Sequence, residues 1–144
     1  MLFSVILSTK TFIQRYSTIK SWNLIIQLGT LNLDRGHHSE AIANFQRALL
    51  YVAEYPPAIV GLAEAILTQP DDKDIASSQH RAEVLLDSVT RLGGWDSSAA
   101  WFWLGEVYER YSMPVKAAEC WTYCEDLEER KPIREWLCVR PQWL

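Results

Sequence analysis

The chain has 144 residues, a formal net charge of −4 and a sequence pI near 5.3, and this length is typical of one domain. Hydrophobic residues make up 49% and charged residues 22%, which excludes a wholly disordered chain. The acidic balance provides no basic surface for nucleic acid and no polybasic segment for an anionic membrane. No stretch approaches the roughly 18 consecutive apolar residues that a membrane span requires.

The first predicted element is a helix over residues 3–18, within an N-terminal segment of residues 1–20. It carries apolar residues at helical spacing, namely Phe12, Ile13, Tyr16 and Ile19. The apolar run Leu2–Leu7 has no basic segment before it and no clear cleavage site after it, so we interpret it as structural and not as a signal peptide. We therefore expect an intracellular protein. The three cysteines, Cys120, Cys124 and Cys138, show no disulfide spacing pattern, which fits that location.

Further helices are predicted in order along the rest of the chain. Their expected ranges are 21–35, 38–53, 56–68, 78–92, 97–111 and 114–130, followed by a short turn at 132–138 and a tail at 139–144. Gly36 suits the left-handed position after a helix, and Pro114 suits a first helical turn. Pro56-Pro57 breaks the chain before the second pair. The run Asp96-Ser97-Ser98, which follows Gly93-Gly94, offers a cap before Trp101.

A repeated pattern organises these helices. The first copy reads Ile25-x-x-Leu28-Gly29-x-x-Asn32, then Ala41-x-x-x-Phe45-x-x-Ala48. A copy 76 residues later has the same internal spacing: Trp101-x-x-Leu104-Gly105-x-x-Tyr108, then Ala117-x-x-x-Trp121-x-x-Cys124. Between them lies a looser copy, Ile59-x-x-Leu62-Ala63-x-x-Ile66, then Ala82-x-x-x-Leu86-x-x-Val89, with a polar insertion over 69–78.

The pattern resembles the tetratricopeptide repeat, a helix pair with Trp-x-x-Leu-Gly-x-x-Tyr on one helix and Ala-x-x-x-Phe-x-x-Ala on the next. Residues at i, i+3, i+4 and i+7 share one helix face, so each copy presents a stripe. Glycine within a helix costs about 1 kcal/mol relative to alanine, and close approach of a neighbouring helix is the reason we infer for Gly29 and Gly105. The predicted fold is an all-α solenoid over residues 21–138, with pairs near 22–53, 56–92 and 98–131.

The resemblance implies that the first helix of each pair lines a concave groove that binds partners. The register places six residues on that side: Ile26, Thr30, Val60, Glu64, Phe102 and Glu106. These are apolar or acidic, whereas the chaperone-tail receptors of the superfamily use lysine and asparagine there, so we do not expect that type of ligand. The alternative interpretation is that Val60 and Phe102 only pack against a neighbouring helix.

Histidines, cysteines and acidic residues were weighed as metal-binding or catalytic groups, and a structural role suits each of them better. We interpret His37 and His38 as turn residues and not as metal ligands, because no Cys or acid completes a ligand set. We interpret Cys120 and Cys124 as packing residues, and the acidic run over 125–129 as a solvated helix end. No phosphate loop, nucleophile elbow or HExxH motif is present in the sequence. We therefore expect no enzyme, no metal and no cofactor.

The second half has a closer resemblance. It contains Leu92-Gly93-Gly94-Trp95-Asp96-Ser97, then Ala100-Trp101-Phe102, Ala117-Ala118-Glu119-Cys120-Trp121, and a segment over 127–136 ending in Trp136. These stretches are similar to the C-terminal repeats of fungal Ypp-type cargo-transport proteins, relatives of the tetratricopeptide-domain-seven scaffold family.

This closer resemblance implies a non-catalytic scaffold that recruits a phosphatidylinositol 4-kinase to a membrane anchor, with a link to endocytic cargo transport. It implies a cytoplasmic protein held at the plasma membrane through its partners. Family members are much longer, so we expect one end of a longer solenoid. A generic peptide-binding repeat module is the alternative. Four tryptophans that lie outside the repeat pattern are Trp95, Trp103, Trp136 and Trp143. They could be buried against further repeats, contact a partner, or pack locally.

Overall fold

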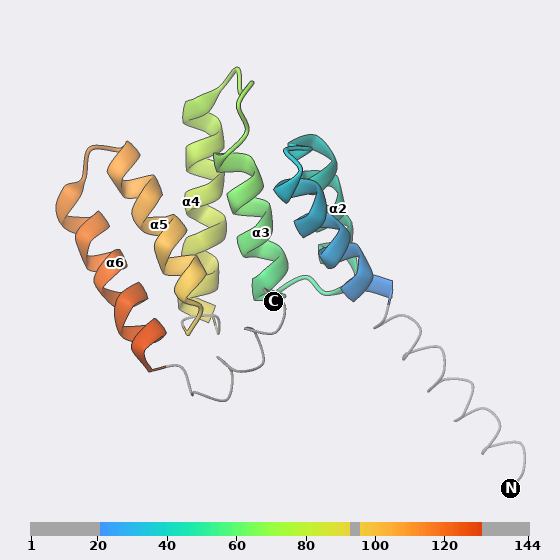
Figure 1. Cartoon of the computed structure of the whole chain (residues 1–144). Helices are drawn as coiled ribbons and strands as arrows, with labels where there is room; N and C mark the ends of the chain where they lie inside the picture. Colours follow the sequence, from blue (N-terminus) through green and yellow to red (C-terminus); the bar gives the residue numbers. More distant parts are fainter. Residues whose placement is uncertain (1–20, 93–95, 131–144) are drawn as a thin grey trace, which may run out of the picture. The chain divides into compact units, whose positions relative to one another are not determined.

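The computed structural model describes residues 21–92 and 96–130, where the regular elements are α-helices without strands (Figure 1). Several predictions fall outside these residues: the helix over 3–18, the turn at 132–138, the tail at 139–144, Cys138, Trp95, Trp136 and Trp143. Within the described part, no helix is long and apolar enough to cross a membrane.

The helices confirm the predicted ranges closely. After a helix over 21–34 come α2 (His38–Tyr51), α3 (Pro56–Leu67), α4 (Ile75–Leu92), α5 (Ser98–Arg110) and α6 (Pro114–Glu129). Pro56 and Pro114 open α3 and α6, and the side chain of Ser97 accepts the backbone N–H of Ala100 at the start of α5.

One boundary differs from the prediction. Helix α4 begins at Ile75, whereas the sequence predicted 78 and placed 69–78 in an irregular insertion. The carboxylate of Asp74 accepts the backbone N–H of Ser77 at 3.2 Å, and the Asp74 carbonyl accepts that of Ser78 at 3.1 Å. Aspartate is a strong N-cap, so Asp74 makes the last part of the insertion helical.

The chain forms two compact units, Met1–Asp71 and Asp72–Leu144, and the boundary falls in the insertion. The first contains the helix over 21–34, α2 and α3, and the second contains α4, α5 and α6. The predicted pair over 56–92 is divided between them, so the pairing of α3 with α4 stays a prediction.

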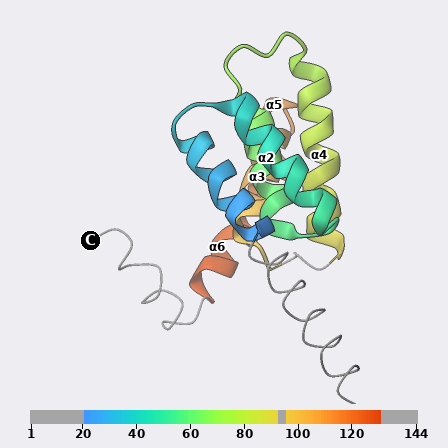
Figure 2. The ribbon, with the colours of Figure 1, turned by 90° about the vertical axis from the view of Figure 1, so that its right-hand side faces the viewer.

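The first unit is built around one phenylalanine. Phe45 of α2 is 1% exposed, and its ring contacts two glycines on the neighbouring helices, which run beside α2 in Figure 2. A Cβ added to Gly29 would meet the ring at 3.0 Å, and one added to Gly61 at 2.5 Å. Real Cβ atoms essentially never approach to the distance at Gly61 and rarely to the distance at Gly29, so both helices pack against Phe45 through their glycines.

The second unit repeats this contact. The indole of Trp121 on α6 lies against Gly105 on α5, where an added Cβ would be 2.6 Å from Trp121 Cδ1. Gly105 and Trp121 follow Gly29 and Phe45 by the same 76 residues. The small residues predicted on the second helices, Ala41, Ala82 and Ala117, are all fully buried. The structure thus confirms an all-helical, tetratricopeptide-like fold in the part of the chain that it describes.

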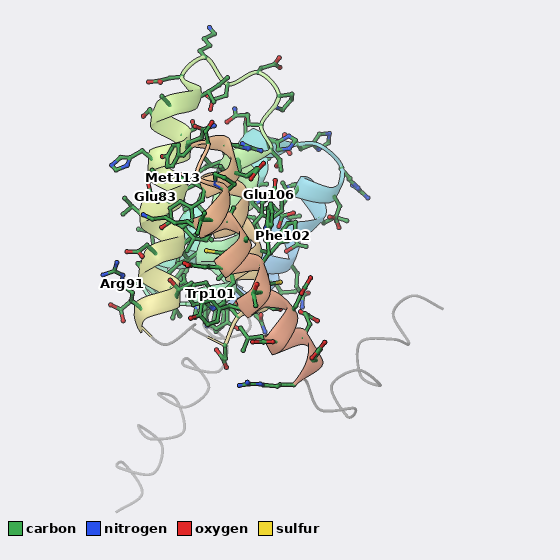
Figure 3. The ribbon with its side chains drawn as sticks, turned by 90° about the vertical axis from the view of Figure 1, so that its left-hand side faces the viewer. Glu83, Arg91, Trp101, Phe102, Glu106 and Met113 are labelled. Atoms are coloured by element: carbon green, nitrogen blue, oxygen red, sulfur yellow. The ribbon has the colours of Figure 1, made fainter. Side chains whose placement is uncertain are left out.

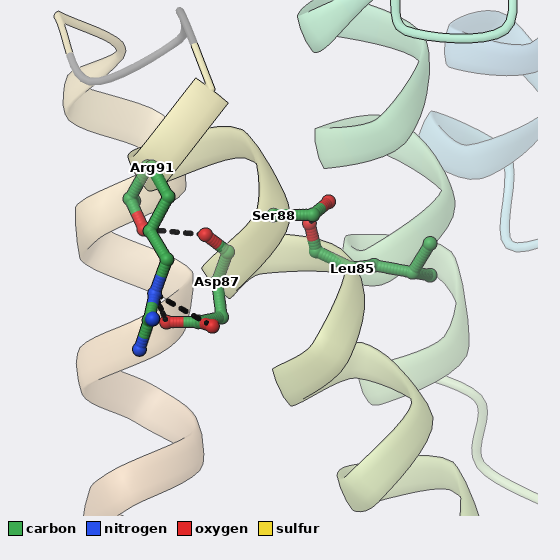
Figure 4. A network of polar contacts seen from close by, with 5 residues as sticks. Leu85, Asp87, Ser88 and Arg91 are labelled. Carbon is green, nitrogen blue, oxygen red and sulfur yellow. Dashed lines mark hydrogen bonds and ion pairs between the residues drawn. The ribbon is translucent and has the colours of Figure 1, made fainter.

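The outer surface of α4 is held by short-range polar contacts (Figure 4). Arg91 Nε lies 3.0 Å from the carboxylate of Asp87, one turn earlier. The hydroxyl of Ser88 donates to the carbonyl of Leu85 at 2.6 Å. An exposed i, i+4 ion pair contributes only about 0.3–0.5 kcal/mol, so these contacts support the helix without determining the fold.

The turns within the first and third repeats have the same geometry. Gly36 follows the helix over 21–34 with φ +80°, and its N–H donates to the carbonyl of Leu33, while His37 N–H donates to that of Asn32. Ser112 follows α5 with φ +58° and makes the equivalent bonds together with Met113. This pair of bonds is the Schellman motif, which favours glycine at the left-handed position.

We expect Ser112→Gly to stabilise the second unit by about 0.5–1 kcal/mol. A left-handed residue with a Cβ costs roughly 1–2 kcal/mol, and the greater unfolded-state entropy of glycine cancels part of the gain from removing that cost. The reverse change at the equivalent turn, Gly36→Ser, should destabilise the first unit. Urea unfolding measures both. A lower midpoint for the Ser112→Gly variant would contradict the expectation.

Candidate partner-binding faces

The structure divides the six predicted groove residues into two groups. Ile26 and Val60 are buried, so they contribute to packing and are not part of an exposed face. The burial of Val60 favours the alternative interpretation, in which this side chain packs against its neighbours. The other four retain exposed or half-buried side chains, and their role in binding stays a prediction. They are Thr30, Glu64, Phe102 and Glu106.

In the second unit, Phe102 and Glu106 lie one turn apart on the same side of α5 (Figure 3). The Phe102 side chain is 42% exposed, and its ring meets that of Trp103 edge to face, with centroids 5.2 Å apart. An exposed aromatic ring beside a carboxylate offers an apolar contact and a charge. This part of α5 therefore suits a partner segment that presents an apolar residue next to lysine or arginine.

In the first unit, Thr30 and Glu64, the two polar residues of the predicted face, lie in different settings. The hydroxyl of Thr30 donates to the carbonyl of Ile26 at 3.1 Å, within its own helix. Glu64 on α3 is half-buried, and burial, followed by the nearby Asp34 carboxylate, raises its pKa. A carboxylate in this setting favours a cation, so Glu64 and Asp34 together would attract a basic side chain.

Glu64 gives a pH-dependent prediction. Because its pKa is raised in the folded state, the protonated form contributes stability that is complete below pH 4.5 and is lost as pH rises through the folded pKa. We expect Glu64→Gln to be more stable than the parent at pH 7 and to reduce the loss of stability between pH 4.5 and neutrality. Thermal melts across this range test it, with Glu54→Gln as an exposed control. Equal pH profiles for the parent and Glu64→Gln would contradict it.

A polar cluster that the sequence did not predict joins the helices of the second unit. The Tyr111 hydroxyl donates to Glu83 of α4, and burial, followed by Glu83, raises the pKa of Tyr111. The same two causes raise the pKa of Tyr108. The ammonium of Lys116 lies 5.4 Å from the centre of the Tyr108 ring. The sequence predicted Tyr108 as a repeat residue but assigned no role to Glu83. A single glutamate carries no recognisable pattern, and only the packing of α4 on α5 brings it near the two tyrosines.

The residues weighed as chemical candidates have structural positions. His37 precedes α2, as predicted for a turn residue, whereas His38 is the first residue of α2. Cys120 is buried, and burial raises the pKa of its thiol. Most of the acidic run is exposed, although Glu128 accepts a hydrogen bond from the hydroxyl of Ser98. In the described residues, no group of three or more His, Cys, Asp or Glu side chains is arranged to hold a metal ion.

Known proteins support the fungal resemblance. The chain is 28% identical over 112 residues to the "Putative cargo-transport protein ypp1" of Schizosaccharomyces pombe, which covers 78% of this chain and 13% of that protein. It is 28% identical to the "Cargo-transport protein YPP1" of Kluyveromyces lactis, over 69% of this chain and 18% of that protein. "Tetratricopeptide repeat protein 37" of Xenopus laevis is 29% identical over 72% of this chain and 6% of its own length.

No family model matches the chain. The predicted resemblance to Ypp-type cargo-transport and tetratricopeptide proteins is nevertheless confirmed by these relatives. The chain spans less than a fifth of the length of each of them.

Proposed function

We propose that this chain is a non-catalytic scaffold segment with a role in trafficking. The observation that carries the proposal is the similarity to two proteins named for cargo transport, which covers most of the chain. Helix-pair repeats are suited to this role, because stacked helices present long surfaces along which several modest contacts add up.

The finer proposal is that the scaffold recruits a phosphatidylinositol 4-kinase to the plasma membrane, with a link to endocytic cargo transport. Its support is the resemblance of the segment over 92–136 to Ypp-type C-terminal repeats. The contact we propose is the α5 face of Phe102 and Glu106, with a client segment that presents an apolar residue beside a basic one. The chain would act as a peripheral protein that reaches the membrane through its partners.

Affinity capture with cross-linking mass spectrometry tests this proposal. We expect the tagged chain, expressed in fission yeast, to recover a lipid kinase or its membrane anchor, with cross-links near α5. The paired substitution Phe102→Ala and Glu106→Arg should reduce that recovery at least several-fold. Val115→Ala on α6 is the matched control, because Val115 is also exposed.

The two functional hypotheses predict different captured proteins. Recovery of unrelated peptides through the α5 face, without a lipid kinase or an anchor, would favour the generic peptide-binding module. Lipid-kinase or hydrolase turnover by the purified chain would contradict the scaffold role.

A further inference from the structure

The last turns of α2 carry one cation and two large apolar side chains on an exposed face. Arg47, Leu50 and Tyr51 stand at i, i+3 and i+4, a spacing that places them on one side of a helix. Leu50 is 85% exposed, the largest fraction among the exposed large hydrophobic residues that the structure describes, and Tyr51 is 50% exposed. We name these three residues the α2 outer patch.

The other copies of the repeat show that packed helices leave this face open. The residues equivalent to Leu50 lie 41 and 76 residues later, at Arg91 of α4 and Asp126 of α6. All three are exposed, although α3 packs on α2 and α5 packs on α4. At 85% exposure Leu50 contributes little to the packing of its own unit. A leucine at a position that is charged in the other two copies, beside an exposed tyrosine, therefore indicates an external contact.

The charge of the α2 outer patch indicates what it can contact. Arg47 is exposed, and among the residues that the structure describes, no carboxylate lies within 4.0 Å of its guanidinium. On α4, in contrast, Arg91 already pairs with Asp87 at 3.0 Å. Arginine and tyrosine are enriched at protein interfaces and at their hot spots. The α2 outer patch thus combines an unpaired cation with two apolar contacts.

We propose that the α2 outer patch binds a partner protein segment that presents an aspartate or glutamate beside an apolar side chain. The carboxylate pairs with the guanidinium of Arg47, whose planar fork can hold both carboxylate oxygens. The apolar side chain lies against Leu50 and Tyr51. An exposed ion pair adds little affinity and mainly selects the sign of the partner's charge, so the apolar contact supplies most of the affinity.

This surface is distinct from the α5 face of Phe102 and Glu106. It belongs to the other unit, and it selects an acidic partner segment, whereas the α5 face suits a basic one. The inference therefore goes beyond the proposed function and does not depend on which client the scaffold recruits.

Peptide selection on the full chain tests the charge preference. A phage library of random dodecapeptides is first depleted on the Leu50→Glu variant, which removes peptides that bind elsewhere, and is then panned on the parent chain. We expect the surviving peptides to carry Asp or Glu next to an aromatic or aliphatic residue. The same selection on an Arg47→Glu chain should recover Lys or Arg in place of the acid, a reversal that a loss of structure would not produce.

Binding assays with a selected peptide locate the site. A fluorescein-labelled acidic peptide should bind the Leu50→Glu and Arg47→Glu variants about ten-fold more weakly or worse, the change that substitution of a hot-spot residue produces. Arg35→Glu is the matched control, because Arg35 is an exposed arginine of the same unit, and its variant should bind as the parent does. Circular dichroism should be the same for all of these chains.

Four results would overturn the proposal. The first is that no peptide survives the depletion, and the second is that the survivors lack acidic residues. The third is a concentration-dependent dimer in sedimentation that Leu50→Glu dissociates, because the occupant would then be a second copy of the chain. The fourth is flotation with phosphatidylserine vesicles that Leu50→Glu abolishes, because the patch would then face a lipid surface.

Discussion

Replacing Phe45 by alanine should lower the free energy of unfolding of the first unit by about 3–5 kcal/mol, the range for a buried phenylalanine truncated to alanine. The ring of Phe45 is 1% exposed and fills the space left by Gly29 and Gly61. Neither glycine has a side chain that could close the cavity, so the loss should fall in the upper part of that range.

Amide hydrogen exchange read by mass spectrometry measures this effect unit by unit. In the Phe45→Ala variant, protection should fall throughout α2 and α3. Leu50→Ala on the same helix is the control, because Leu50 is 85% exposed and its truncation should change protection little. Equal losses of protection in the two variants would show that Phe45 is not the centre of this core.

Gly105→Leu should destabilise the second unit by about 1–3 kcal/mol or more through overpacking. Even a Cβ at this position would lie 2.6 Å from Trp121 Cδ1. The atoms that the Cβ would meet belong to the rigid indole ring, so only a movement of the whole ring would relieve the clash. One kilocalorie lowers the melting temperature of a domain of 60–100 residues by about 4–8 °C, so calorimetry detects the change.

A double-mutant cycle identifies the cause of that loss. If the leucine clashes with the indole, Gly105→Leu should cost much less in a Trp121→Ala background, with a coupling free energy of about 0.5–3 kcal/mol. Ala99→Leu, at an exposed position of α5, controls for the leucine itself. An unchanged melting temperature for Gly105→Leu would show that the repeat register is wrong, and equal costs in the two backgrounds would place the clash elsewhere.

The repeat register predicted much of this fold because helix contacts recur with the period of the sequence. Gly29 with Phe45 and Gly105 with Trp121 are equivalent pairs, and both are in contact. The start of α4 was predicted less well. Asp74 lies within a polar, aspartate-rich stretch, and only its bonds to Ser77 and Ser78 show which aspartate begins the helix.

The candidate binding face was predicted only in part. The register assigned Ile26 and Phe102 to the same predicted side of their helices, yet Ile26 is buried and Phe102 is exposed. Periodicity determines which residues share a face, but exposure depends on what packs against that face. For the same reason, periodicity did not predict that Gly61 would contact the Phe45 ring or that Glu83 would accept a hydrogen bond from Tyr111.

The sequence by itself determined the helices, their pairing within the first and third repeats, and the close approach of the paired helices at Gly29 and Gly105. These features depend on residues less than 40 positions apart, whose spacing along a helix translates directly into contact. Only the tertiary structure decided which equivalent faces are covered. Leu28 and Leu104 occupy the same repeat position, and one is half-exposed while the other is buried. The exposure of a residue depends on what packs against it, which the residue's own motif does not encode.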